Sequence, residues 1–245
     1  MILELDLGNT RGKWRLLDGD GVRARGSISI AALKNDELPD SWLELRPQRV
    51  RAANVAGAAV ADALTAAVHR RFALPVEFAR VASQCAGVTC AYQNTERLGV
   101  DRWLAVLAAH HKDPRAALIV DCGSAVTLDL LDNGGCHLGG YIVPGLNLMR
   151  RALYQDTDAV KVPPAFAPDM SLAPGRDTDE AVNRGLVVMV LGAIDRAMAE
   201  LGSPEVELPQ LWLTGGDGPL LSALCQWPHQ LVPELVLDGL ALSNP

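Results

Sequence analysis

Two stretches of the chain repeat one pattern, and this repeat restricts the fold more than any other feature. Each stretch is an apolar run ending in Asp-x-Gly, followed by small polar residues and a second apolar run. The dipeptide Asn133-Gly134 favours a two-residue hairpin turn at the end of the second copy. We therefore predict two related halves, each with one strand–turn–strand hairpin. A single insertion-free offset of 115 positions relates Asp6 to Asp121, Gly8 to Gly123 and Gly19 to Gly134.

Strand and helix patterns alternate along the rest of the chain, which indicates an α/β fold. The pair Asp113-Pro114 ends a helical pattern, so we place a domain boundary there and predict domains 1–114 and 115–245. Strands are expected over 49–55 and 139–143, and helices over 58–72, 100–112 and 177–201.

The composition excludes several classes of function. A net charge of −7 and a sequence pI of about 5.2 argue against a nucleic-acid partner, which requires a basic surface. No apolar run reaches the ~18 residues of a spanning helix, so no membrane partner is expected. The five cysteines form no C-x-x-C pair, and the N-terminal strand pattern carries acidic residues instead of a basic leader. These features predict a reducing, cytoplasmic location.

The residues around each repeated Asp are typical of a phosphate site. Glycine lets the backbone approach an anion, and small neighbours leave its N–H groups exposed. Asp6 is expected to hold Mg²⁺ through water, with phosphate oxygens on Asn9 and Thr10. Lys13 would neutralise the phosphate charge. The alternative is an ordinary solvated turn, for which Asp, Gly and Asn are also usual. The repeat disfavours that alternative, because the second copy supplies Asp121, Gly123, Ser124 and Thr127.

A third glycine turn follows an apolar strand pattern at Thr214-Gly215-Gly216. It would place an adenosine or its α-phosphate against bare backbone, although Gly-Gly pairs also occur in many loops. The chain has no P-loop motif and no G-x-G-x-x-G after its first strand, which disfavours those two nucleotide sites. The residues expected to bind the nucleotide are Asp6, Leu7, Gly8, Asn9, Thr10, Arg11, Gly12, Lys13, Gly123, Ser124, Thr127, Gly215 and Gly216.

Six motifs occur in order between residues 6 and 217. They are Asp6-x-Gly8-Asn9-Thr10-x-x-Lys13, Gly99-x-Asp101-Arg102-Trp103, Asp121-x-Gly123-Ser124-Ala125-x-Thr127, Gly139-Gly140-Tyr141-Ile142-x-Pro144-Gly145, Thr178-x-x-Ala181-x-x-x-Gly185 and Thr214-Gly215-Gly216-Asp217. Together they resemble the type III pantothenate kinase family, within the superfamily of acetate and sugar kinases, Hsp70 and actin. The resemblance implies two duplicated RNase-H-like domains with a cleft between them.

The same resemblance implies an activity and its cofactors. The activity is ATP-dependent phosphorylation of pantothenate to 4′-phosphopantothenate, the first step of coenzyme A biosynthesis. The cofactors are Mg²⁺ and a monovalent cation (K⁺ or NH₄⁺), and the assembly is a homodimer.

The resemblance also assigns roles to residues. Asp101 corresponds to the base that faces the pantothenate hydroxyl, and Asp121 to the ligand of the monovalent cation. Ser124 matches the ATP contact, where the family often has Thr, and Cys122 replaces a usual aliphatic residue. The substrate pocket would be lined by Tyr92, Gly99, Val100, Asp101, Arg102 and Thr178, the last from the partner subunit.

The residues around Asp101 support this chemistry independently. A carboxylate in the first turn of a helix can orient an acceptor hydroxyl, and the planar guanidinium of Arg102 matches a carboxylate. The alternative is that Asp101 only caps its helix, paired with Arg102 or Arg97. Two other functions stay open: a sugar or acetate-type kinase, which would lack the Gly99-x-Asp101-Arg102 motif, and an accessory factor of a transcription regulator without kinase activity.

Overall fold

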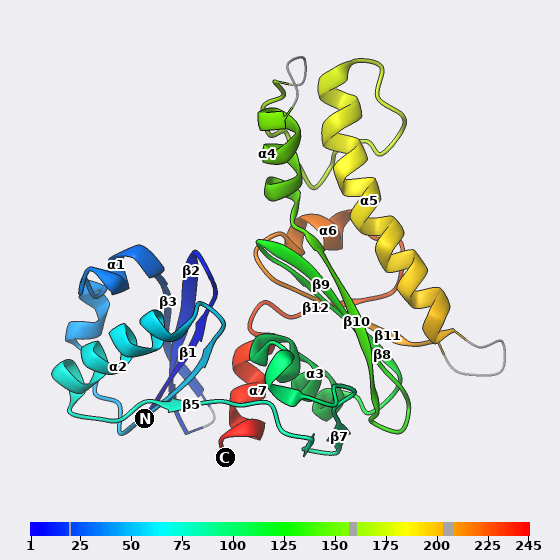
Figure 1. Ribbon diagram of the computed structural model, residues 1–245. Coiled ribbons are helices and arrows are strands. Elements are labelled where there is room, and N and C mark those ends of the chain that lie inside the picture. Colours follow the sequence, from blue (N-terminus) through cyan, green and yellow to red (C-terminus); the bar gives the residue numbers. More distant parts are fainter. Residues whose placement is uncertain (20, 157–160, 203–207) are drawn as a thin grey trace. The chain divides into compact units, whose positions relative to one another are not determined.

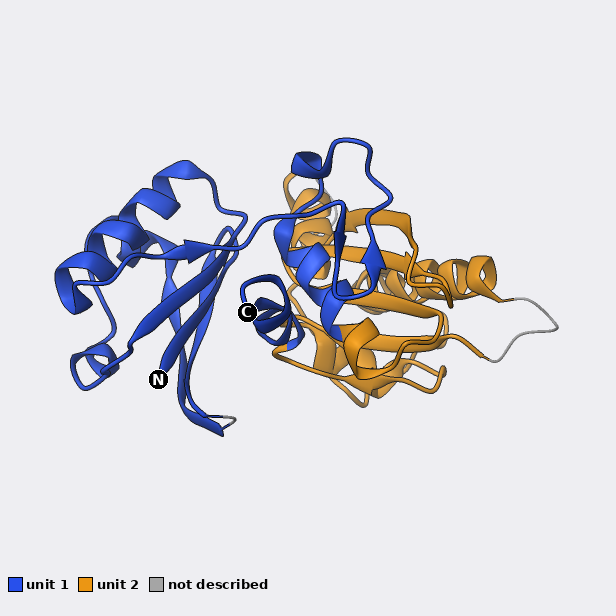
Figure 2. Ribbon diagram, turned by 90° about the horizontal axis from the view of Figure 1, so that it is seen from below, with its two compact units in different colours: residues 1–108, 235–245 blue, residues 109–234 orange. Residues whose placement is uncertain are grey.

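The computed structural model describes residues 1–245 except 20, 157–160 and 203–207. The chain forms two compact units, residues 1–108 with 235–245 and residues 109–234 (Figure 2). Each unit contains a five-stranded mixed sheet (Figure 1). A short antiparallel pair is formed by β6 (Gln84–Cys85) and β7 (Val88–Thr89).

The sheet of the first unit has the strand order β3-β2-β1-β4-β5. Successive residues of a strand face opposite sides, so Leu3 and Leu5 enter the core with α2 while Glu4 and Asp6 face the other side. The antiparallel strands are β1 (Ile2–Leu7), β2 (Arg11–Asp18) and β3 (Gly21–Ser29), and the strands parallel to β1 are β4 (Arg49–Asn54) and β5 (Glu77–Phe78). The helical segments are α1 (Ile30–Lys34), η1 (Asp40–Leu43), α2 (Ala58–Phe72) and η2 (Thr95–Arg97).

The sheet of the second unit repeats this order as β10-β9-β8-β11-β12. Its strands are β8 (Ala117–Cys122), β9 (Ala125–Leu131), β10 (His137–Pro144), β11 (Gln210–Thr214) and β12 (Gln230–Leu231). The helices are α4 (Leu146–Asp156), α5 (Thr178–Leu201), which packs on β8 and β9, and α6 (Gly218–Leu224). The identical strand order confirms the predicted α/β class and the duplication.

The hairpins depart from the predicted register. Asp6 lies opposite Lys13, whereas Asp121 lies opposite Thr127, so the inner turn of the second hairpin is one residue shorter. Its outer connection is longer, because β9 ends at Leu131 and β10 begins at His137. The predicted two-residue turn at Asn133-Gly134 is therefore wrong, and so is the insertion-free offset beyond the first turn.

The outer connection has a different physical basis from the predicted turn. The Asp132 carboxylate accepts hydrogen bonds from the backbone N–H groups of Gly134 and Cys136, both at 2.8 Å. This side-chain-supported turn accommodates more residues than a primed two-residue turn.

The last helix belongs to a different unit from the one predicted. Residues 235–245 were expected in the second domain, but α7 (Leu235–Ser243) packs on β1 and β4 of the first unit. The unit boundary lies within α3 (Val100–Lys112), and α7 crosses α3 where Gly239 rests on the backbone of Leu104. Polar side chains fix α7, since Asp238 bonds to Arg15 at 2.7 Å. Among the residues that the structure describes, no helix is long and apolar enough to cross a membrane.

Candidate functional site

The turn between β8 and β9 is held by backbone hydrogen bonds. The N–H of Gly123 donates to the carbonyl of Ala125, and the N–H of Gly145 donates to the carbonyl of Ser124, both at 3.0 Å. A Cβ on Gly145 would overlap the carbonyls of Gly123 and Ser124. The absence of a side chain at Gly145 thus lets the start of α4 pack against this turn, which fixes the backbone of Ser124.

The Asp121 carboxylate lies at the carboxyl end of β8, next to two glycines. A Cβ on Gly123 would lie 3.5 Å from Asp121 Oδ1, and a Cβ on Gly215 would overlap the same oxygen. Thr214 is the strand partner of Asp121, and the N–H of Asp217 donates to the carbonyl of Cys122 at 2.8 Å. The structure therefore brings the second phosphate turn and the third glycine turn together within one unit.

Two titratable groups beside this turn have shifted pKa values. Burial raises the pKa of the Asp217 carboxyl, which occupies the N-cap position of α6 without capping it. Burial raises the pKa of the Cys122 thiol far above its ordinary value, with further contributions from Asp121 and Asp217. Cys122 is fully buried and stays protonated, so it acts as a packing residue.

The first hairpin presents its polar residues outward. Asn9 and Thr10 are exposed in the turn between β1 and β2, and Arg11 is exposed at the start of β2. Leu7 is fully buried, and a Cβ on Gly12 would lie 2.5 Å from a methyl group of Leu7. Leu7 and Gly12 can therefore offer only backbone groups to a ligand, while the other turn residues can also offer side chains.

The residues around Asp101 form a third group, in the first unit. Asp101 Oδ1 accepts a hydrogen bond from the backbone N–H of Arg102 at 2.8 Å, and a Cβ on Gly99 would lie 2.6 Å from this oxygen. Arg102 is 6 % exposed and donates to the hydroxyl of Tyr92 at 3.2 Å. The Arg102 guanidinium also lies 5.9 Å from the centre of the Tyr92 ring. Four of the predicted substrate residues therefore lie close together: Tyr92, Gly99, Asp101 and Arg102. The fifth, Val100, lies between Gly99 and Asp101 in the sequence and is half-buried.

Comparison with known proteins places this chain in a family. The family model described as type III pantothenate kinase matches residues 2–200. The chain belongs to the type III pantothenate kinase family. A relative of that name from Chromohalobacter salexigens is 42% identical over all of this chain and 88% of its own length. Another, from Pseudomonas paraeruginosa, is 41% identical over all of this chain and 99% of its own length.

Solved structures support the fold. A Campylobacter jejuni protein assigned to the Baf family of transcriptional activators superposes with a TM-score of 0.61 at 23% identity, covering 98% of this chain and 95% of its own. A Sinorhizobium meliloti protein assigned as a 2-dehydro-3-deoxygalactonokinase gives 0.58 at 13% identity, covering 99% and 98%. These likenesses show a shared two-sheet architecture and carry no functional argument.

The carboxylate of Asp6 in the first hairpin is a donor of the kind that suits the divalent metal used with ATP by a kinase of this family. Asp6 and Asp121 end equivalent strands, and carboxylate oxygens are the ligands that Mg²⁺ prefers. The described part of the chain holds no group of three or more His, Cys, Asp or Glu side chains that could bind a metal unaided.

Thr178 is the remaining predicted substrate residue of this pantothenate kinase family member. It is the exposed first residue of α5, whose N-cap residue Asp177 accepts from the N–H of Glu180 at 2.8 Å. Thr178 belongs to the second unit, whereas Tyr92, Asp101 and Arg102 belong to the first.

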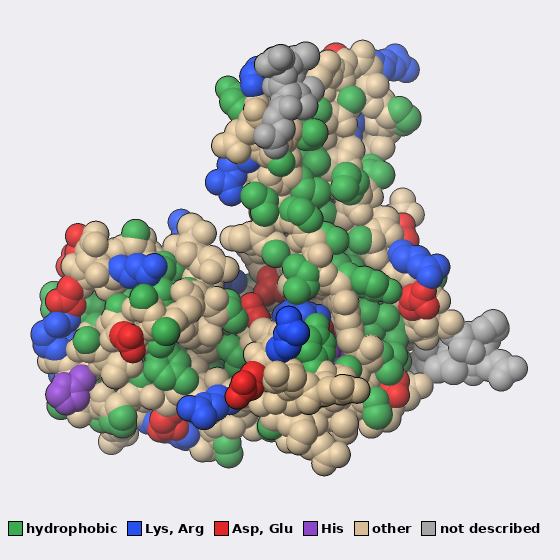
Figure 3. Space-filling view, viewed as in Figure 1, with side chains coloured by type: hydrophobic (Ala, Val, Ile, Leu, Met, Phe, Trp, Pro, Cys, Tyr) green, Lys and Arg blue, Asp and Glu red, His purple; other side chains and the backbone are tan. Residues whose placement is uncertain are grey.

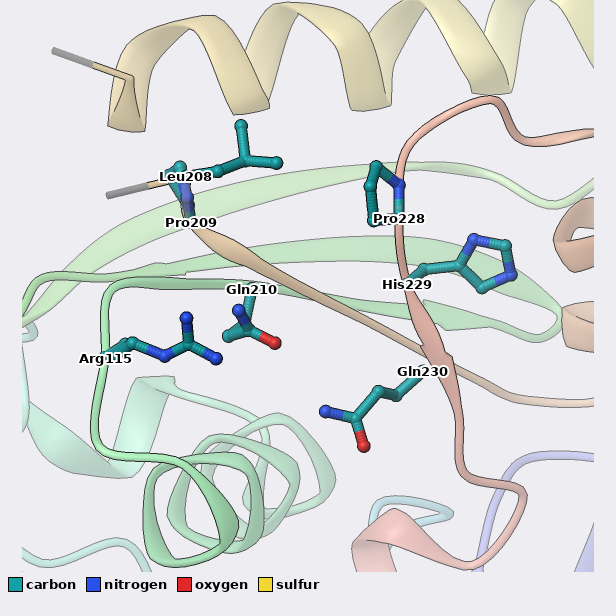
Figure 4. A pocket seen from close by; sticks show the side chains of 7 residues that line it. All are labelled: Arg115, Leu208, Pro209, Gln210, Pro228, His229 and Gln230. Atoms are coloured by element: carbon teal, nitrogen blue, oxygen red, sulfur yellow. The ribbon is translucent and has the colours of Figure 1, made fainter. Parts of the chain in front are cut away.

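A cavity that the sequence did not predict lies at the other end of the second sheet (Figure 4). Its volume is about 330 Å³, and it is lined by Arg115, Leu208, Pro209, Gln210, Pro228, His229 and Gln230. These residues lie where β11 and β12 begin, whereas Asp121 lies where the parallel strand β8 ends. Arg115 is already bonded to Asp113 at 2.6 Å, so its charge is not available to a bound anion.

Proposed function

We propose that this chain transfers the γ-phosphoryl group of ATP to the hydroxyl of pantothenate, giving 4′-phosphopantothenate. Family membership supports the reaction, and the observation that carries it is that the Asp101 carboxylate and the buried Arg102 guanidinium belong to adjacent residues in the first turn of α3. Pantothenate has a hydroxyl and a carboxylate, and these two side chains match both groups. This activity is the first step toward coenzyme A.

Asp101 orients the hydroxyl that attacks the phosphoryl group. Phosphoryl transfer passes through a loose transition state, so catalysis depends mainly on position and charge. One oxygen of Asp101 is held by the N–H of Arg102, and the missing side chain of Gly99 leaves room for it. A carboxylate fixed in this way accepts the hydroxyl hydrogen bond and takes the proton as the new bond forms.

The two hairpins bind the phosphates. Asn9, Thr10 and Lys13 of the first hairpin and Ser124 and Thr127 of the second contact phosphate oxygens. The bare backbone of Gly8, Gly123 and the Gly215-Gly216 turn lets phosphate and adenosine approach closely. Mg²⁺, when bound near Asp6, neutralises charge on the phosphates, and Asp121 holds a monovalent cation, K⁺ or NH₄⁺.

The active form is a homodimer. Apolar side chains gather on the face formed by α4, α5 and β10 (Figure 3). The large apolar side chains of these three elements that are at least 44 % exposed include Tyr141, Ile142, Leu148, Val188 and Met189. Exposed apolar side chains gathered on one face are typical of a subunit interface, and such an interface would let Thr178 of α5 serve the partner's substrate. We also propose a cytoplasmic location, and the net charge of −7 disfavours binding to nucleic acid or to an anionic membrane surface.

A direct assay tests the reaction. Purified full-length protein with Mg-ATP and K⁺ should release ADP only when pantothenate is added, and mass spectrometry should show one added phosphate. Acetate, glycerol and a panel of sugars serve as matched acceptors. ADP release with a sugar or acetate but not with pantothenate would overturn the proposal in favour of another kinase of the superfamily. Removal of K⁺ should lower the rate, and NH₄⁺ should restore it.

Replacing Arg102 with lysine is expected to raise KM for pantothenate about 10- to 100-fold, with a smaller change in kcat. Lysine keeps the charge but loses the planar fork that binds a carboxylate through two hydrogen bonds. The control is an analogue whose carboxylate is replaced by a neutral alcohol. The wild type should use it poorly, and Arg102→Lys should cause little further loss. An equal loss for both substrates would show that Arg102 acts only through packing with Tyr92.

A further inference from the structure

The turn after β11 rests directly on the end of β8. Gly215 has a φ of +90°, a backbone conformation that side chains strongly disfavour. A Cβ at this position would lie 2.5 Å from the backbone N and C of Cys122 and would overlap Oδ1 of Asp121. The volume that a side chain would need is therefore occupied by the Asp121 carboxylate and the Cys122 backbone.

We infer that Gly215 is a positioning residue for Asp121, so that the nucleotide on the Gly215-Gly216 turn and the cation on Asp121 are coupled through one shared contact. This inference rests on the proposed function, which supplies the two ligands. It adds that Gly215 positions the Asp121 carboxylate in addition to binding the nucleotide.

The neighbouring glycines differ from Gly215 in this respect. Gly216 is exposed, and a Cβ there would meet nothing within 4 Å. A Cβ on Gly123 would make only ordinary contact with Asp121, at 3.5 Å. The conflict with the carboxylate is thus specific to Gly215, and Gly216 offers a matched control in the same turn.

A backbone hydrogen bond makes the contact rigid. The N–H of Asp217 donates to the carbonyl of Cys122 at 2.8 Å, and Thr214 is the strand partner of Asp121. The turn is therefore fixed on both sides of Gly215, and a shift of Gly215 must also move Asp121. Coupling between two ligands is reciprocal, so K⁺ should tighten nucleotide binding by the same factor as nucleotide tightens K⁺ binding.

The experiment measures nucleotide affinity by calorimetry, with a non-hydrolysable ATP analogue and Mg²⁺, in KCl and in choline chloride at equal ionic strength. We expect the wild type to bind about 10-fold more tightly in K⁺, within the usual range of coupling. Gly215→Ala should abolish this ratio. Gly216→Ala should keep the ratio, whatever its own affinity. Asp121→Asn should abolish the ratio, and adding Gly215→Ala to it should change the ratio no further.

The outcomes separate the inference from the function on which it rests. A K⁺ ratio retained in Gly215→Ala would overturn the inference, and so would a wild type that phosphorylates pantothenate but binds nucleotide equally in both salts. If Gly215→Ala does not fold, the wild type and Asp121→Asn decide, because a ratio retained in Asp121→Asn also overturns it. A wild type that neither binds the analogue nor phosphorylates pantothenate refutes the proposed function itself.

Discussion

Replacing Asp101 with asparagine is expected to lower kcat for pantothenate phosphorylation by about 10³-fold, within the range for loss of a general base. Asparagine has nearly the same shape, and its side-chain oxygen can still accept the hydrogen bond that Arg102 N–H gives to Asp101. The substitution removes the negative charge and the proton acceptor but keeps the helix cap. Coupled ADP release measures kcat, and thermal unfolding should show an unchanged Tm.

A nearby acid gives the control for this variant. Glu96 is exposed in the short helix η2, and Glu96→Gln removes one negative charge from the same region. Its kcat and KM should match the wild type. Full turnover by Asp101→Asn would show that Asp101 is only a capping acid, the alternative that its sequence position left open. A loss of Tm in parallel with kcat would point to the same conclusion.

Local patterns allowed most of the fold to be predicted. Period-2 and period-3.6 hydrophobicity located β8, β9, α3 and α5, because these signals depend on residues that are close in sequence. The register of the hairpins was harder to predict. One offset fitted three residue pairs, yet Thr127 and not a later residue lies opposite Asp121. A one-residue slip moves every side chain of a strand to the other face. The sequence does hold this signal, because after the turn an offset of 114 aligns Leu16-Leu17-Asp18 with Leu130-Leu131-Asp132.

The candidate site was also predictable only where it depends on residues that are close in sequence. The motifs identified which carboxylates and glycines to expect, but not why two of the glycines are required. Gly99 and Gly215 each leave room for a carboxylate oxygen, of Asp101 and Asp121 respectively. The first relation is local and could have been inferred from spacing. The second joins residues from separate strands, and only the pairing of β8 with β11 brings them together.

Replacing Glu4 with alanine is expected to lower the free energy of unfolding of the first unit by about 3–5 kcal/mol. Glu4 is fully buried and bonds Arg15 at 2.6 Å and Arg51 at 2.8 Å. Burial opposes the charge on Arg15, but Glu4 and Asp238 outweigh it and raise the pKa of this guanidinium. An arginine side chain stays protonated in proteins, so Arg15 cannot lose its proton to relieve the loss of Glu4. Urea titration followed by circular dichroism measures the loss.

An exposed ion pair provides the matched comparison for Glu4→Ala. Asp18 bonds Arg23 at 2.7 Å with both side chains more than a third exposed, so Asp18→Ala should cost at most ~1 kcal/mol. Glu4→Ala should also loosen α7. Arg15 still bonds Asp238, and Arg51 still bonds the carbonyl of Asn244, but Glu4 no longer fixes the two guanidinium groups. Faster hydrogen exchange in residues 235–243 would report this loosening. A cost no greater than that of Asp18→Ala, with α7 still protected, would mean that water replaces the lost carboxylate.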